Sequence, residues 1–82
     1  MLRIKKPMRL DEFEFSHYFW LKWPIMFRKH YNDVDSGAIT TVTVNGNTGE
    51  IKIDGNITLE ILEDFCDMQA AGILEKRSNN YD

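Results

Sequence analysis

The chain has one cysteine, Cys66, and two prolines among its 82 residues. A single thiol excludes an internal disulfide and a cysteine-based zinc cluster, and it favours a reducing, cytoplasmic setting. No apolar run reaches the roughly 20 residues that a membrane-spanning helix needs. No apolar segment follows the basic N-terminus as a secretion signal requires. We therefore expect a cytoplasmic protein without a membrane span.

The sequence also lacks the features of a catalytic or cofactor site. His17 and His30 are its only histidines, and both lie in or beside an aromatic-rich segment, where an imidazole is more often packed than reactive. Gly46 and Gly49 lie between two predicted strands and not before a helix, so they predict no phosphate-binding loop. No calcium-binding loop is present. We expect no enzymatic activity, no cofactor and no metal site.

The residues that are present suffice for one small folded domain over residues 1–82. The chain is 43% hydrophobic and 12% aromatic, with a net charge of -3. A core is feasible but marginal at this length, and the charge gives no general attraction to nucleic acid. We predict an α+β fold with a broken N-terminal helix, a two-stranded antiparallel β-hairpin and a C-terminal helix.

The predicted segments follow from local patterns. Asp11 and Glu14 form a capping-box pattern before an aromatic run that Pro24 interrupts. Alternating strands flank a turn rich in Asn and Gly, in a register that places Val44 opposite Ile51. The segments are a basic arm (1–9), a broken aromatic-rich helix (11–31), a β-hairpin (38–54), a helix capped by Thr58 (58–72) and a polar tail (75–82).

The aromatic segment offers more apolar surface than a small domain can cover. Eight of the ten Phe, Trp and Tyr residues lie between Phe13 and Tyr31, and in a helical projection they occupy every side. Most of them are expected to build the core. We predict that Phe15, Phe19 and Trp23 remain exposed and bind a partner protein, because aromatic residues are enriched at interface cores.

The predicted C-terminal helix carries an acidic stripe. Four carboxylates without an intervening base fall within one 100° sector, at Glu60, Glu63, Asp64 and Asp67. A solvated face is the simplest explanation of such a stripe. A functional explanation is that the stripe attracts a basic partner or mimics the charge of DNA, and a further alternative is that it attracts the chain's own basic arm (1–9).

A nucleic-acid interface is the less favoured alternative. Arg28 and Lys29 fall on the predicted second short helix, just before the hairpin, in an order similar to that of a small winged-helix DNA-binding regulator. The acidic net charge and the small number of bases weigh against it.

We therefore expect a small protein-binding module that regulates or inhibits a larger partner by occupying it. In size and character the chain resembles the small accessory proteins that bacteriophages encode, such as inhibitors of bacterial defence and lysis regulators. No motif carries this resemblance, so it assigns no residue a role. A homodimer formed through the aromatic surface is compatible with this function.

Overall fold

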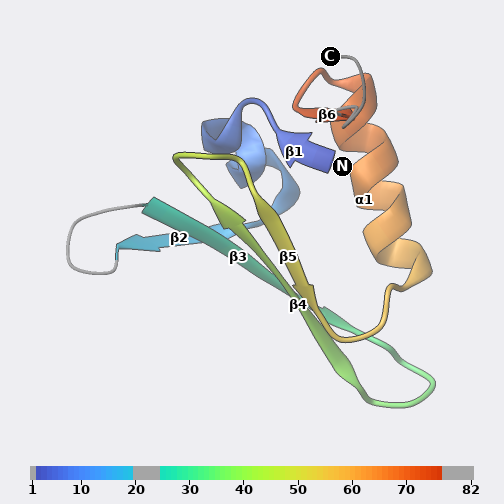
Figure 1. The fold of residues 1–82 in the computed structure, drawn as a ribbon. Coiled ribbons are helices and arrows are strands. Elements are labelled where there is room, and N and C mark those ends of the chain that lie inside the picture. Colours follow the sequence, from blue (N-terminus) through green and yellow to red (C-terminus); the bar gives the residue numbers. More distant parts are fainter. Residues whose placement is uncertain (1, 20–24, 77–82) are drawn as a thin grey trace.

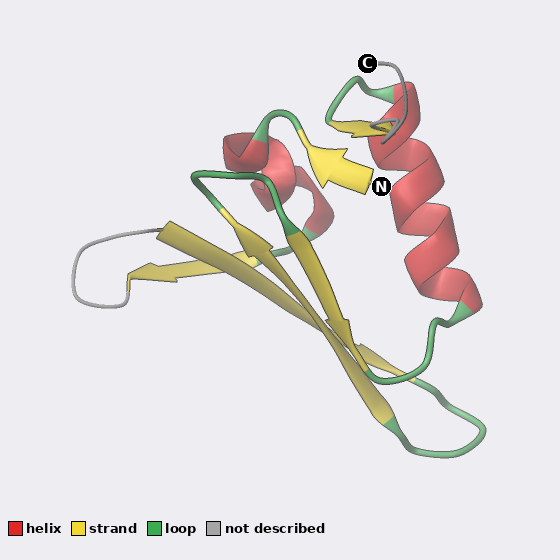
Figure 2. Cartoon of the chain, viewed as in Figure 1, coloured by secondary structure: helices red, strands yellow, loops and turns green. Residues whose placement is uncertain are grey.

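A four-stranded antiparallel sheet and one α-helix dominate the computed structural model, which describes residues 2–19 and 25–76 (Figures 1 and 2). The four strands follow one another in the order β2–β3–β4–β5, and a separate two-stranded pair joins β1 to β6. In chain order the elements are β1 (Leu2–Ile4), the 3-10 helix η1 (Pro7–Phe13), β2 (Ser16–Phe19), β3 (Ile25–Asn32), β4 (Ile39–Asn45), β5 (Ile51–Asp54), α1 (Leu59–Ala70) and β6 (Leu74–Lys76).

The predicted broken helix over residues 11–31 is wrong, and so is the predicted fold of two helices and one hairpin. β2 and β3 occupy most of that segment, so the sheet has four strands in place of two and the fold is mostly β. In β3, Phe27 and Tyr31 are buried whereas Arg28 and His30 are exposed, which is the two-residue period of a strand. The predicted break at Pro24 lies outside the described residues.

Two physical causes explain the strands in this segment. Aromatic side chains fit the pleated, half-buried surface of a sheet, and they favour strands over helices. In addition, β3 pairs with β4 over seven residues, from Met26 opposite Asn45 to Asn32 opposite Ile39. That ladder satisfies the backbone donors and acceptors which a helix would otherwise satisfy internally.

The capping box at Asp11 is also wrong. The helical turn η1 begins four residues earlier at Pro7, where a fixed φ suits the first helical position. It ends at Phe13, and the capping residue Glu14 adopts a left-handed φ of 68° and donates its backbone N–H to the Asp11 carbonyl at 3.1 Å. Glu14 therefore closes the turn and does not reach back to its start.

The β4–β5 hairpin has the predicted register. Val44 lies opposite Ile51 and Val42 opposite Ile53. The Asn45 N–H donates to the Glu50 carbonyl at 2.9 Å, and the Asn45 side chain accepts two backbone N–H groups of the turn. The hairpin is confirmed because its pattern is local to the turn and its two flanks.

The helix α1 begins and ends where the sequence predicts. The Thr58 hydroxyl caps it by accepting the Ile61 N–H at 3.3 Å. Past its C-terminus Gly72 takes a left-handed φ of 78°, and the buried Ile73 donates its N–H to the Met68 carbonyl at 2.9 Å.

Both ends of the described chain are paired with each other. Arg3 in β1 lies opposite Glu75 in β6, and their side chains form an ion pair at 2.8 Å. Glu75 and Lys76, which we predicted as the start of a polar tail, are thus part of a strand. Within the predicted basic arm, residues 2–4 form β1 and η1 begins at Pro7. Residues 77–82 lie outside the described part.

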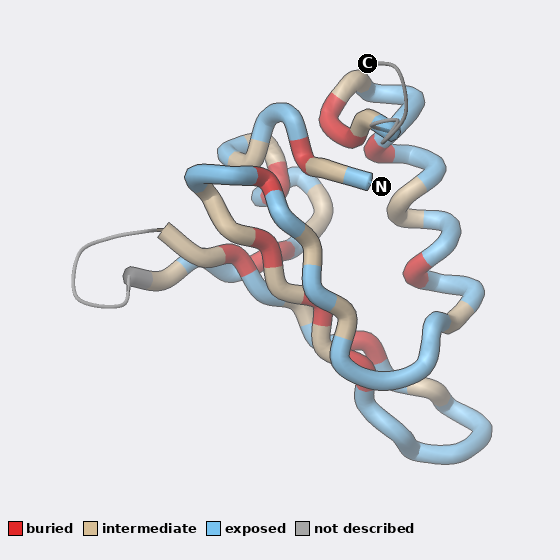
Figure 3. Tube along the Cα trace, in the orientation of Figure 1, coloured by how far each residue is buried: buried red, intermediate tan, exposed pale blue. Residues whose placement is uncertain are grey.

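The core lies between one face of the four-stranded sheet and the elements that cover it. In Figure 3 the buried positions gather where the sheet faces α1, η1 and the β1–β6 pair. The buried hydrophobic residues are Ile4, Leu10, Phe15, Phe27, Tyr31, Val42, Val44, Ile61, Met68, Ile73 and Leu74. The opposite face of the sheet carries exposed polar side chains.

Candidate functional site

Helix α1 presents a second apolar stripe that the described part of the domain does not cover. Ile61 and Met68 are fully buried against the core. Leu59 and Leu62, on a different side of the helix, are 71% and 51% exposed, and Cys66 is exposed as well. Positions 59, 62 and 66 recur every three and four residues, so their side chains form one stripe along the outer face of α1.

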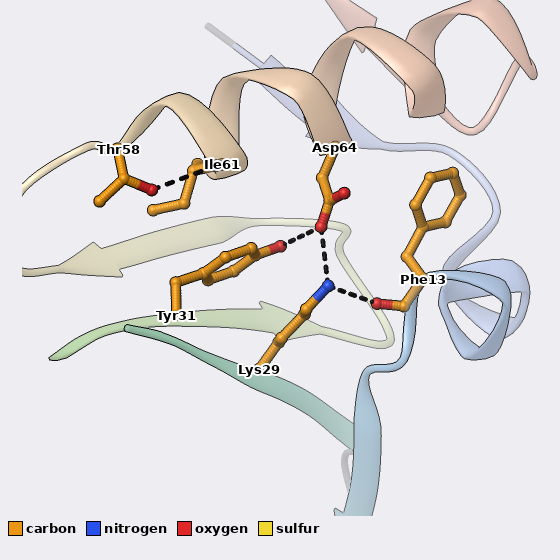
Figure 4. Close-up of polar contacts among 6 residues, drawn as sticks. All are labelled: Phe13, Lys29, Tyr31, Thr58, Ile61 and Asp64. Atoms are coloured by element: carbon orange, nitrogen blue, oxygen red, sulfur yellow. Dashed lines mark hydrogen bonds and ion pairs between the residues drawn. The ribbon is translucent and has the colours of Figure 1, made fainter. Parts of the chain in front are cut away.

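A polar cluster fixes which side of α1 faces the sheet. The Asp64 carboxylate oxygen Oδ2 accepts hydrogen bonds from the Tyr31 hydroxyl at 2.7 Å and from Lys29 Nζ at 2.8 Å (Figure 4). Lys29 Nζ also donates to the Phe13 carbonyl at 2.8 Å. We call Lys29, Tyr31 and Asp64 the clasp, because they join β3 to α1 across the edge of the core.

The clasp is largely removed from solvent. The Lys29 and Asp64 side chains are 14% and 19% exposed, and Lys29 Nζ lies 4.7 Å from the centre of the Tyr31 ring. Burial, reinforced by the hydrogen bond to Asp64, raises the pKa of the Tyr31 hydroxyl far above its ordinary value of about 10. Tyr31 therefore stays neutral and remains a donor, so the clasp acts as a fixed structural contact.

The remaining acids of α1 border the exposed stripe. Glu60, Glu63 and Asp67 are exposed, and they line a shallow depression together with the stripe residues. All the residues that line it belong to one helix, so no second element within the described ranges closes it. A small ligand is normally held in a concave site that surrounds it, whereas an open surface of this kind suits a protein partner.

Of the predicted aromatic contact surface, the structure describes the side chain of Phe15 alone. Phe15 is only 4% exposed and belongs to the core, so it is not available to a partner. The backbone of Phe19 lies in β2, but its side chain is outside the described part of the structure. Trp23 is outside it altogether.

The predicted acidic stripe is divided by the fold. Asp64 turns toward the sheet and forms the clasp, whereas Glu60, Glu63 and Asp67 face solvent. Three of the four carboxylates on which the DNA-mimic hypothesis depends are thus exposed to solvent.

The predicted nucleic-acid residues are separated as well. Arg28 and Lys29 are neighbours on a strand, so their side chains point to opposite faces of the sheet. The Arg28 guanidinium lies over the Tyr18 ring at 4.9 Å, while Lys29 is held in the clasp. The helical segment that a winged-helix protein would insert into DNA is a strand in this chain.

Sequence reasoning missed Leu59 and Leu62 as surface residues. The available signal was the spacing itself: α1 carries one apolar set at Ile61, Phe65 and Met68 and a second at 59, 62 and 66. One small sheet covers a single side of a helix, so one of the two sets had to stay exposed.

Within residues 2–19 and 25–76, no group of three or more His, Cys, Asp or Glu side chains is placed to hold a metal ion. No helix in the same described part is long and apolar enough to cross a membrane. No protein-family model matches the chain, and no match emerges among curated proteins or solved structures.

Proposed function

We propose that this chain is a protein-binding module that regulates or inhibits a larger partner by occupying it, with the outer face of α1 as its contact surface. The observation that carries the proposal is the exposure of Leu59 and Leu62, at 71% and 51%, on a helix fixed by the clasp. We place the protein in the cytoplasm, as its single cysteine favours. The proposed role is binding without catalysis or a cofactor.

The energetics support a contact at this face. Burying the exposed parts of Leu59 and Leu62 gives about 1–2 kcal/mol each, from the usual value for a buried leucine. Helix α1 is already folded and held, so a partner would not have to order it. Exposed carboxylates beside an apolar centre also match the common arrangement of a polar rim around an apolar interface core.

The test replaces Leu59 and Leu62 together with Gln and follows partner capture from the native host. Met8 is the matched control, because it is 64% exposed and lies in η1 rather than in α1. We expect the wild type and Met8→Gln to retain the same partner, and the double variant to lose it. Urea unfolding of all three proteins establishes that the fold is kept. Undiminished partner binding by a folded double variant would refute the proposal.

A further inference from the structure

The spacing of the exposed stripe on α1 matches a helix-to-helix seam. Leu59, Leu62 and Cys66 are separated by three and then four residues, as are the a, d and a positions of a heptad repeat. All three are exposed, and the clasp keeps them turned away from the sheet. We infer that a basic amphipathic helix of the partner protein binds this face, an inference that rests on the proposed function.

The negative charge beside the stripe of Leu59, Leu62 and Cys66 favours a basic partner helix. Glu63 lies next to the seam on the helical projection, and Asp67 and Glu60 lie beyond it on the same side. Among the described residues, the only ion pair that α1 makes is the one between Asp64 and Lys29, so these three carboxylates have no basic partner there. A helix with Lys or Arg along one flank would pair with them while its apolar residues cover Leu59 and Leu62.

A second copy of this chain fits the same face poorly. Two α1 helices packed seam to seam bring six carboxylates into one small interface. In an antiparallel pair Glu63 lies beside its own counterpart, because equivalent flanking positions meet in that orientation. Like charges at such distances oppose association. The complementarity therefore favours a partner of opposite charge over a homodimer.

The test uses a synthetic helical peptide of about 18 residues, long enough to span α1. It carries Leu at the a and d positions and Lys at the flanking e and g positions, and a matched peptide carries Glu in place of Lys. Fluorescence anisotropy with the full chain at about 50 mM salt should show saturable binding of the Lys peptide. We expect the affinity of the Glu peptide to be at least about tenfold lower.

Charge reversal on the protein separates this inference from the proposed function. The variant Glu60→Lys/Glu63→Lys/Asp67→Lys should prefer the Glu peptide, and the milder Glu63→Gln/Asp67→Gln variant should lose most of the preference for Lys. Equal binding of both peptides, or binding of neither, would overturn the inference. A wild-type dimer in light scattering that Leu62→Gln dissolves would overturn it in favour of a second copy. The proposed function is tested separately, by capture of the natural partner with Leu59→Gln/Leu62→Gln.

Discussion

Replacing Asp64 with alanine tests the clasp, on which the placement of α1 depends. The substitution removes the acceptor for the Tyr31 hydroxyl at 2.7 Å and for Lys29 Nζ at 2.8 Å. Lys29, with only 14% of its side chain exposed, would then keep the Phe13 carbonyl as its partner and have no counter-charge in the clasp. The outer face of α1 is set by this contact, so the stability of the fold and the geometry of the proposed surface change together.

The magnitude follows from the burial of the pair. Breaking a buried ion pair by removing one partner costs about 3–5 kcal/mol, and a value near 3 kcal/mol suits a pair with this residual exposure. Alanine is the better helix former, which offsets about 0.5 kcal/mol of the loss. A domain of this size is stable by about 4–12 kcal/mol, so Asp64→Ala should remove a large share of the total.

Urea unfolding followed by far-ultraviolet circular dichroism measures the effect. Asp67→Ala is the matched control, because it gives the same gain in helix propensity at an exposed acid. It should not lower the free energy of unfolding, and it should raise it by no more than about 0.5 kcal/mol. The double variant Lys29→Met/Asp64→Leu should be more stable than the sum of its two single changes predicts. A loss below about 0.5 kcal/mol for Asp64→Ala would refute the argument for the clasp.

Three further predictions concern stability. The pKa of Tyr31 is raised in the folded state, so above pH ~10 the unfolded chain loses this proton first and the stability that Tyr31 contributes declines. The difference in unfolding free energy between wild type and Tyr31→Phe should therefore be constant between pH 7 and 9 and shrink above pH ~10 in urea titrations. Glu14→Gly should raise the free energy of unfolding by about 0.5–1 kcal/mol, because glycine adopts the left-handed φ of 68° without strain. The urea midpoint should rise accordingly. Gly49→Ala should cost about 3 kcal/mol against about 1 kcal/mol for Gly72→Ala, since both have positive φ but only the Cβ at Gly49 would meet a backbone atom, the Ile4 carbonyl oxygen.

Each of these predictions has a contradicting outcome. A Tyr31→Phe difference that stays constant through pH 11 would show that the hydroxyl ionises equally in both states. A lower urea midpoint for Glu14→Gly would mean that the carboxylate side chain stabilises the turn more than its φ strains it. Equal costs at Gly49 and Gly72 would mean that β1 moves freely away from the β4–β5 turn.

The hairpin and α1 could be predicted from sequence because their signals are local. The turn at Asn45 lies between two alternating strands, and Thr58 and Gly72 lie at the helix ends. The strands β2 and β3 could not be predicted in this way. A run of aromatic residues places apolar side chains at both the two-residue spacing of a strand and the spacing of a helix, so it does not distinguish the two. Their structure is decided by pairing of β2 with β3 and of β3 with β4, and neither strand contains its partner in its own sequence.

The candidate site was predicted only in part, for a similar reason. Glu60, Glu63 and Asp67 were placed on the surface of the helix by periodicity alone. The inward turn of Asp64 depends on Lys29 and Tyr31, which lie more than thirty residues away in the chain. The spacing within residues 58–72 predicts that one apolar set of α1 stays exposed. That the exposed set is the one with Leu59 and Leu62 depends on this contact and on the burial of Ile61 and Met68 against the sheet.

Alkylation of Cys66 is the most direct test of the central claim, that the outer face of α1 contacts the partner. Cys66 is the only cysteine of the chain, it is exposed, and it lies in the stripe with Leu59 and Leu62. Its rate of reaction with iodoacetamide is measured for the free protein and for the complex with the partner recovered from the host. The reaction should be several times slower in the complex, because the partner covers the thiol. An unchanged rate in a saturated complex would contradict this claim.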